Sequence, residues 1–263
     1  MLMKLFLKLT HFEMIKPTPY GSFHLSFLIL SIVALFVFCR FFKSKNERRS
    51  NQILFFVGLF LLVLEIYKQI YFTLVIGNGY YIWAVFPLQP CSIPMYLCLL
   101  VPFIKGQNIK KGFYNYIYIY GTLGGVVVLL FPNNVFTTHL TMNLHTFVWH
   151  FALVFLGVFL YKIDLIDINN GYKIPAILYL CFALTAFFIN IFVNKFLNQF
   201  ISLFFIGPNI ENIFLITDLH RLFGWQIASV LTIFLVSIIG YAFFRITKLL
   251  KNKNSVYFSN NVF

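Results

Sequence analysis

The chain has 263 residues, of which 60% are hydrophobic and only 10% are charged. An ordinary soluble domain carries roughly 25% charged residues, so this composition excludes a disordered chain, a nucleic-acid-binding module and an ordinary cytosolic enzyme. Twenty Lys and Arg against seven Asp and Glu give a formal net charge of +13. We expect an all-α, polytopic membrane protein, and the distribution of the basic residues along the chain should report its orientation.

Seven apolar runs are long enough to cross a bilayer as helices of about 20 residues. They cover residues 22–42, 53–76, 86–104, 113–131, 144–161, 174–192 and 225–244. Three prolines crowd the start of the third run and make it the least regular. A further apolar stretch, 200–206, is too short to cross, and we expect it to be interfacial or re-entrant. Residues 1–263 are expected to form a single membrane domain that ends in a basic tail, 245–263.

The basic residues follow alternate spans. Fourteen of the twenty Lys and Arg lie in the segments 40–49, 105–111, 162–173 and 245–253. With seven spans these segments all fall on one side, which the positive-inside rule makes cytoplasmic, with the N-terminus outside. An even number of spans would put the first basic loop and the basic tail on opposite sides. Met1–Leu9 mixes Lys with Leu and Phe and shows no cleavage site, so we expect an interfacial stub.

Polar side chains inside a membrane are costly, which makes each one a candidate for function. In this chain the residues of interest are His24, Glu65, Lys68, Gln89, Cys91, His145, His150 and Asn190. With a rise of 1.5 Å per residue, Cys91 lies about 8 Å below the outer end of the third span, and His150 about 9 Å below that of the fifth. Most of the others also fall in the outer half, which predicts a polar site there. Helix-to-helix hydrogen bonding without chemistry is the alternative, and it fits Asn190 well.

The segment PLQPCSIP, residues 87–94, is the most informative stretch. Proline is favoured at the first helical position, so we expect Pro90 to open the third helix and Cys91 to lie in its first turn. Unpaired backbone N–H groups and the positive end of the helix dipole favour a thiolate there. His150, at matching depth, can act as the base of a Cys/His pair, and the same N–H groups can bind the oxyanion of an attacked ester.

No metal-binding, cofactor-binding or proton-relay pattern is predicted. The other cysteines, Cys39, Cys98 and Cys181, are assigned as small buried hydrophobic residues, and the four cysteines form no CxxC pair and no zinc spacing. Glu65 is the only carboxylate inside a span, and it stands at i,i+3 from Lys68 on one helix face. We therefore expect a structural ion pair there rather than a relay.

Two stretches resemble a known family. FPLQPCSIPMYLCLL (Phe86–Leu100) resembles the PLHLC- or HPCH-type third-span motif of the YwaF-type bacterial integral membrane proteins. The stretch 118–150, which includes Gly124, Pro132 and His139, resembles their next motif, in which a Gly-containing helix ends near a Pro and a helix with a His follows. Weaker similarities extend the resemblance over about residues 20–245.

The YwaF-type family is similar to a eukaryotic TMEM-type membrane enzyme that moves acyl chains between phospholipids and ether lysophospholipids. The resemblance implies that Cys91 takes the acyl group and that His150 activates it, in a bacterial plasma membrane. Supporting residues are expected among His24, His139, His145, Gln89 and Asn190. The chain departs from the bacterial pattern at Gln89, where a His often stands, and from the eukaryotic one at Ser92, where a His stands. Neither position supplies a second base.

Three functions follow from these observations. The leading hypothesis is a membrane-embedded lipid acyltransferase or lipid hydrolase near the outer leaflet, with membrane phospholipid or lysophospholipid as substrate and no nucleic-acid partner. The second is a transporter or solute-binding protein, because broken helices mark binding sites near the bilayer midplane. The third is a non-catalytic assembly or receptor protein. The sequence leaves the acyl donor, the acceptor and the oligomeric state open.

Overall fold

The computed structural model describes residues 10–41, 46–169, 171–210, 213 and 215–260, with only the backbone described for 253–260. Within these ranges every regular element is helical, and strand-like pairing is limited to one isolated bridge between Glu13 and His139. This confirms the predicted all-α architecture. The expectation for Met1–Leu9 lies outside the described residues.

Six helical segments in the described ranges are long and apolar enough to cross a membrane. They are α2 (Ser22–Phe41), α3 with η1 (Glu47–Tyr71 and Phe72–Ile76), the continuous α5–η4–α6 (Gln107–Tyr116, Ile117–Gly121 and Thr122–Leu130), α7 (Leu140–Lys162), α8 (Lys173–Phe196) and α9 (Ile216–Asn260). Each contains most of one predicted run, and several begin earlier because their first turns are polar. The α3 helix, for example, starts after Asn46, whose side chain accepts a hydrogen bond from the Arg49 N–H at 3.1 Å. In α9 the helix breaks at Gly224 (φ 72°), directly before the predicted run 225–244.

The third crossing is not a membrane-length helix, which corrects the span predicted for 86–104. Here α4 (Ile93–Leu100) is followed only by one 3-10 turn, η3 (Val101–Phe103), and together they rise about 16 Å. A short 3-10 turn, η2 (Trp83–Val85), and irregular chain precede them. Prolines in this stretch remove backbone donors and disfavour a helix before them.

The predicted helix start at Pro90 is therefore wrong. Cys91 lies in a turn ahead of α4, which the Ser92 N–H closes by donating to the Gln89 carbonyl at 2.8 Å. The thiol is consequently outside the first turn of the helix, and the expected support from the helix N-terminus does not apply.

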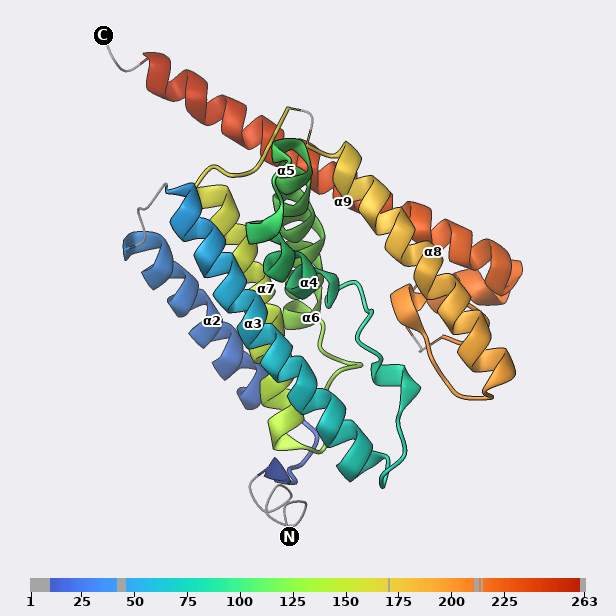
Figure 1. Ribbon diagram of the computed structural model, residues 1–263. Helices are drawn as coiled ribbons and strands as arrows, with labels where there is room; N and C mark the ends of the chain where they lie inside the picture. Colours follow the sequence, from blue (N-terminus) through green and yellow to red (C-terminus); the bar gives the residue numbers. More distant parts are fainter. Residues whose placement is uncertain (1–9, 42–45, 170, 211–212, 214, 261–263) are drawn as a thin grey trace.

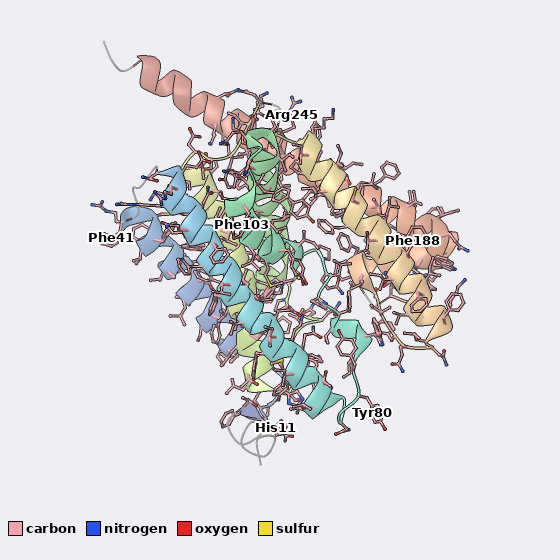
Figure 2. The ribbon with its side chains drawn as sticks, in the orientation of Figure 1. His11, Phe41, Tyr80, Phe103, Phe188 and Arg245 are labelled. Atoms are coloured by element: carbon pink, nitrogen blue, oxygen red, sulfur yellow. The ribbon has the colours of Figure 1, made fainter. Side chains whose placement is uncertain are left out.

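The chain still passes from one end of the bundle to the other between α3 and α5, so the start of α2 and the last described turn of α9 lie at opposite ends (Figure 1). His11 and Tyr80 mark one end and Arg245 marks the other (Figure 2). Ion pairs between Lys110 and Glu47 (3.6 Å) and between Lys251 and Asp164 join segments at the basic end. The seven crossings agree with the predicted polytopic bundle, and the cytoplasmic assignment of the basic end stays a prediction.

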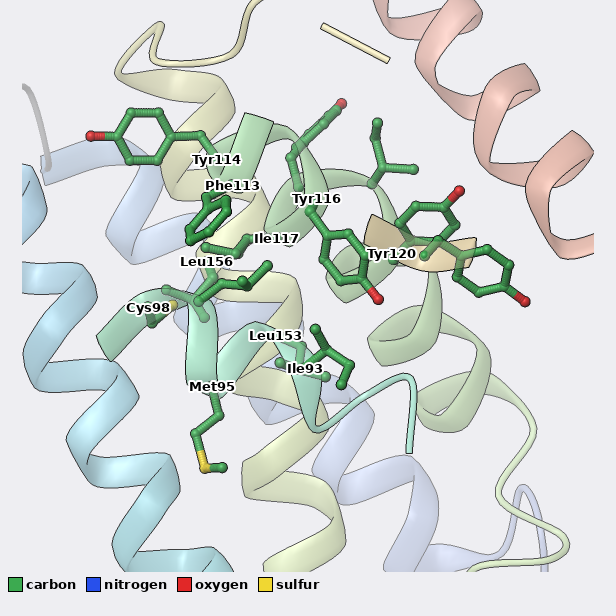
Figure 3. Close-up of a cluster of buried hydrophobic side chains, with 14 of the residues drawn as sticks. Ile93, Met95, Cys98, Phe113, Tyr114, Tyr116, Ile117, Tyr120, Leu153 and Leu156 are labelled. Atoms are coloured by element: carbon green, nitrogen blue, oxygen red, sulfur yellow. The ribbon is translucent and has the colours of Figure 1, made fainter. Parts of the chain in front are cut away.

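The core forms where the short α4 packs between α3, α5–η4 and α7 (Figure 3). Its fully buried members include Ile93, Met95, Cys98, Tyr116, Ile117, Leu153 and Leu156. Two glycines permit the close packing of α4. A Cβ at Gly58 of α3 would lie 2.8 Å from the Cys98 Cβ, and one at Gly121 of η4 would lie 3.3 Å from Pro94. This packing places the turn that carries Cys91 inside the bundle.

The short apolar stretch 200–206 is non-helical apart from η5 (Leu203–Phe205), and it is buried from Ile201 onward except for the half-buried Phe205, whereas Phe200 is exposed. Its backbone is bound by the Asn190 side chain, which donates to the carbonyls of Leu203 (2.9 Å) and Ile206 (2.7 Å) and accepts from the Leu203 N–H (3.0 Å). Irregular backbone at membrane depth is tolerated where protein groups satisfy it. Of the two expectations for this stretch, its burial favours the re-entrant one.

Candidate functional site

Cys91 lies against α6 and α7. The Trp149 indole N–H of α7 donates to the Cys91 carbonyl at 3.2 Å, and a Cβ at Gly124 of α6 would lie 4.0 Å from the Cys91 Cβ. The cysteine is half-buried, whereas Cys98 is fully buried and Cys39 and Cys181 are exposed. The structure thus corrects the assignment of Cys39 and Cys181 as buried residues and leaves Cys91 at a junction of three elements.

His150 lies beside the same part of α6. Its carbonyl oxygen would be only 2.7 Å from a Cβ at Gly125, the residue after the glycine that faces Cys91. The side chain is buried in α7, next to Trp149. Cys91 and the His150 backbone therefore pack against adjacent glycines of α6, and no hydrogen bond joins the thiol to the imidazole among the described residues.

The hydrogen bonding of His150 fixes which of its ring nitrogens is free. Nδ1 lies 2.7 Å from the Thr146 carbonyl oxygen. Because a carbonyl oxygen only accepts, Nδ1 must carry the hydrogen, and in the neutral ring Nε2 bears the lone pair. This is the tautomer that a general base requires.

The predicted ion pair is confirmed, and it lies at this site. Lys68 Nζ is 2.8 Å from one Glu65 oxygen and 3.0 Å from the other, and the Gln69 amide donates to the same carboxylate at 2.7 Å. Glu65 is only 3% exposed. The Lys68 ammonium interacts electrostatically with Cys91, His145 and His150. A pair predicted to be structural thus contributes to the electrostatic environment of the Cys/His region.

His145 belongs to the same region. Its ring stacks on Trp149 with centroids 5.6 Å apart, and it bonds to the backbone of Leu64 in α3. Its Nε2 is buried without a partner among the described residues. An imidazole nitrogen in this state is suited to receive a substrate group or an ordered water molecule.

Two of the other histidines lie away from Cys91. His24 is fully buried and joins the end of α6 to α2, since its Nε2 donates to the Leu129 carbonyl at 2.7 Å and its Nδ1 accepts from the Tyr20 N–H at 2.8 Å. His139 lies just before α7 at the end of the molecule that carries the N-terminal segment, with its ring 5.5 Å from that of His11.

The two amides in the candidate set hold the re-entrant segment. Gln89 donates to the Ser202 carbonyl and accepts from the Phe204 N–H, both at 3.2 Å, and Asn190 binds the same segment from α8. Gln89 is two residues before Cys91, so it couples the cysteine turn to the re-entrant segment. Asn190 acts on the architecture rather than on the thiol.

The structure adds Trp149 and Tyr116 to the residues found by sequence reasoning. A signal for Trp149 existed, because a buried indole N–H needs an acceptor and this one precedes His150. Nothing in the sequence distinguishes Tyr116 from the other tyrosines, of which the chain has fifteen in all. The Tyr116 hydroxyl is buried without a hydrogen-bond partner in the described part of the chain, in the same region as Cys91.

The described residues contain no group of three or more His, Cys, Asp or Glu side chains that could hold a metal ion. The site is therefore built from a thiol, two imidazoles, a buried ion pair and aromatic polar groups. Such a set is suited to nucleophilic chemistry with acid–base assistance.

Comparison with known proteins supports the membrane assignment. Residues 19–244 match the TMEM164 family, nearly the stretch over which the motif resemblance extends. No curated protein and no solved structure matches the chain. The family match spans α2 to most of α9 and includes Cys91 and His150. The chain thus belongs to the TMEM164 family and is a multi-pass membrane protein.

Proposed function

We propose that this protein is a membrane-embedded lipid acyltransferase, with Cys91 as the nucleophile and His150 as the base. The observation that carries the proposal is the packing of Cys91 and of the His150 backbone against adjacent glycines of α6, with Trp149 bonded to the Cys91 carbonyl. The resemblance of the cysteine motif to acyl-transferring relatives points to the same reaction. The proposed location is the outer half of a bacterial plasma membrane.

The reaction runs in two balanced steps. His150 Nε2 takes the thiol proton while Cys91 Sγ attacks the ester carbonyl of a phospholipid. The C–O bond breaks, a thioester forms, and the released lysophospholipid hydroxyl receives the proton. In the second step the hydroxyl of an acceptor lysophospholipid gives its proton to His150 and attacks the thioester, which restores the thiol. Attack by water in place of the acceptor would release a fatty acid, which is the hydrolase variant.

Electrostatic support comes from Lys68. In a low-dielectric interior an ammonium group stabilises a nearby thiolate or oxyanion far more than it would in water. The Glu65 carboxylate holds the ammonium in place with contacts of 2.8 and 3.0 Å, and therefore also reduces the cost of burying it. The unpartnered Tyr116 hydroxyl is a second donor for the developing oxyanion.

The gap between thiol and imidazole is expected to close on substrate binding. Catalytic hydrogen bonds are often long in the free enzyme and shorten when substrate binds. Gln89 links the Cys91 turn to the buried segment around Ser202, so movement of that segment would move the thiol.

The test is acyl exchange by purified protein in vesicles that contain a labelled phosphatidylcholine and an unlabelled lysophospholipid. Cys91→Ala should abolish transfer, and His150→Ala should lower it by about 10²–10⁴-fold, the usual contribution of a general base. Cys181→Ala, at an exposed cysteine, is the matched control and should transfer normally.

Trapping supplies an independent readout. A mass shift of one acyl chain on the peptide that contains Cys91, lost after hydroxylamine, would support the thioester. Full transfer by Cys91→Ala would refute the mechanism.

A transport function is the second candidate, because the third crossing is a discontinuous helix beside a buried ion pair. It predicts solute flux in proteoliposomes that survives Cys91→Ala. The same preparation therefore separates the two functions.

A further inference from the structure

A groove with a volume of about 740 Å³ opens at the basic end of α3. Its walls come from the first turns of α3, from η3 and from the start of α5. Phe103, which lies on the wall formed by η3, marks its place in Figure 2. Phe56, the lining residue of α3 nearest in sequence to Glu65, is nine residues from it, or about 14 Å along the helix. The groove is thus separate from the site around Cys91.

The shortness of the third helix explains the groove. α3 and α4 touch at Gly58, where a Cβ would lie 2.8 Å from the Cys98 Cβ. Beyond this contact α4 gives way to η3, which ends at Phe103, and the chain turns into α5. A membrane-length third helix would continue alongside α3, whereas here the rings of Phe55 and Phe103 lie 6.1 Å apart on the groove wall.

The walls change from polar to apolar along α3. The interfacial end carries Arg48, Asn51 and Gln52 on α3 and Lys110 on α5. One to two turns deeper the lining is aromatic, and Phe56 and Phe103 are 65% and 71% exposed. This is the order of groups in a phospholipid, with a charged head at the membrane surface and a chain beneath it.

The charged end has an excess of positive charge. Lys110 is 3.6 Å from Glu47, which compensates one of the two cations. Arg48 takes part in no hydrogen bond or ion pair with any residue that the structure describes. The Asn51 oxygen accepts from the Tyr114 hydroxyl at 2.5 Å, which leaves the amide N–H groups of Asn51 to donate. An arginine and an amide donor at the interface complement a phosphate oxygen.

We propose that this groove binds an anionic glycerophospholipid of the leaflet at the basic end of the protein. The phosphate would face Arg48, Asn51 and Lys110, and one acyl chain would lie along Phe56 and Phe103. Basic pockets between membrane helices are known to bind anionic head groups. The proposal requires no chemistry at Cys91 and stands whether or not the protein transfers acyl chains.

The experiment uses Phe103→Trp as a reporter in the full-length protein, reconstituted in phosphatidylcholine vesicles. A tenth of the lipid is replaced by phosphatidylglycerol with brominated acyl chains, or by brominated phosphatidylcholine. The native Trp83, Trp149 and Trp225 lie outside the groove, and their quenching in the parent protein is subtracted. Quenching of the Phe103→Trp indole should be several-fold stronger with brominated phosphatidylglycerol than with brominated phosphatidylcholine.

Charge variants of the Phe103→Trp reporter protein test the site. Arg48→Gln should lower the preference for phosphatidylglycerol about fivefold, from the usual contribution of one basic residue at an anionic surface. Arg49→Gln is the matched control, since Arg49 is the adjacent, exposed cation and does not line the groove. Unchanged quenching by brominated phosphatidylcholine would show that the groove is intact in each variant. Equal quenching by the two lipids, or an equal loss in both charge variants, would overturn the proposal.

Discussion

Replacing Asn190 by leucine should destabilise the protein through the re-entrant segment. The asparagine is fully buried in α8, and its amide makes three hydrogen bonds to the backbone of Leu203 and Ile206, at 2.7 to 3.0 Å. Leucine has the same branching as asparagine, with larger end groups, so the substitution keeps the shape of the side chain while it removes the amide. It leaves the buried Ile206 carbonyl and Leu203 N–H without the Asn190 amide as their partner, and it removes one of two donors to the Leu203 carbonyl, which keeps the Ile206 N–H at 3.3 Å.

The magnitude follows from these three bonds. A side-chain hydrogen bond within a membrane protein contributes about 0.6 kcal/mol on average, whereas an unsatisfied buried group costs about 1–3 kcal/mol. For two unsatisfied groups and one further lost bond we expect a loss of about 2–5 kcal/mol in the free energy of unfolding. Local opening of 201–207 should increase by at least about 30-fold, because 1.4 kcal/mol corresponds to a factor of ten.

Two measurements check this expectation. Unfolding by SDS in mixed micelles reports global stability, and amide hydrogen exchange of the peptide that covers 201–207 reports local opening. The matched control is Thr185→Val, on the exposed side of the same helix, where only an intrahelical bond to the Cys181 carbonyl is lost. An Asn190→Leu protein with the SDS midpoint and the exchange rates of the Thr185→Val protein would refute the reasoning.

Three further predictions concern the bundle. Glu65→Gln leaves the Lys68 ammonium without its anion, so unfolding by SDS should show a free energy of unfolding that is lower by about 3–5 kcal/mol. The double variant Glu65→Gln/Lys68→Met should recover most of this loss. Gly125→Ala would place a Cβ 2.7 Å from a backbone carbonyl oxygen of α7, so thermal unfolding should show a free energy of unfolding that is lower by about 1–3 kcal/mol. Gly124→Ala is the control and should be close to neutral, because its Cβ would meet its nearest neighbour only at 4.0 Å. If the basic end is cytoplasmic, a membrane-impermeant maleimide should label Tyr80→Cys in intact cells and a cysteine in the basic tail only after permeabilisation. Reversed labelling would disprove the orientation.

The long helices could be predicted from the sequence because each rests on a local property. An apolar run of about 20 residues must be helical to satisfy its backbone in lipid, whatever surrounds it. The third crossing could not be predicted in the same way. Its apolar run, 86–104, is long enough to span a bilayer. The prolines, however, prevent a helix over the first half of the run, and a hydropathy profile does not include the backbone donors that prolines lack.

The candidate site could be predicted only in part. Cys91 and His150 were found by depth and motif, and the i,i+3 spacing identified the pair of Glu65 and Lys68. Their meeting in one region depends on the rotation of α3 and α7, which a weakly amphipathic membrane helix does not encode in its sequence pattern. The predicted depth in the membrane also grouped His24 with Cys91 and His150. In the structure His24 instead joins the start of α2 to the end of α6.

The π-helical turn η4, Ile117–Gly121, sets the rotation of α5 relative to α6. A π turn accommodates one residue more than the α-helix it interrupts. Removing a single residue there would restore α-helical register and rotate α5 by about 100° relative to α6. Tyr116 would then turn away from Cys91 while Gly124 stayed in place. A one-residue deletion, which leaves the hydropathy profile almost unchanged, is thus a specific means of separating Tyr116 from Cys91.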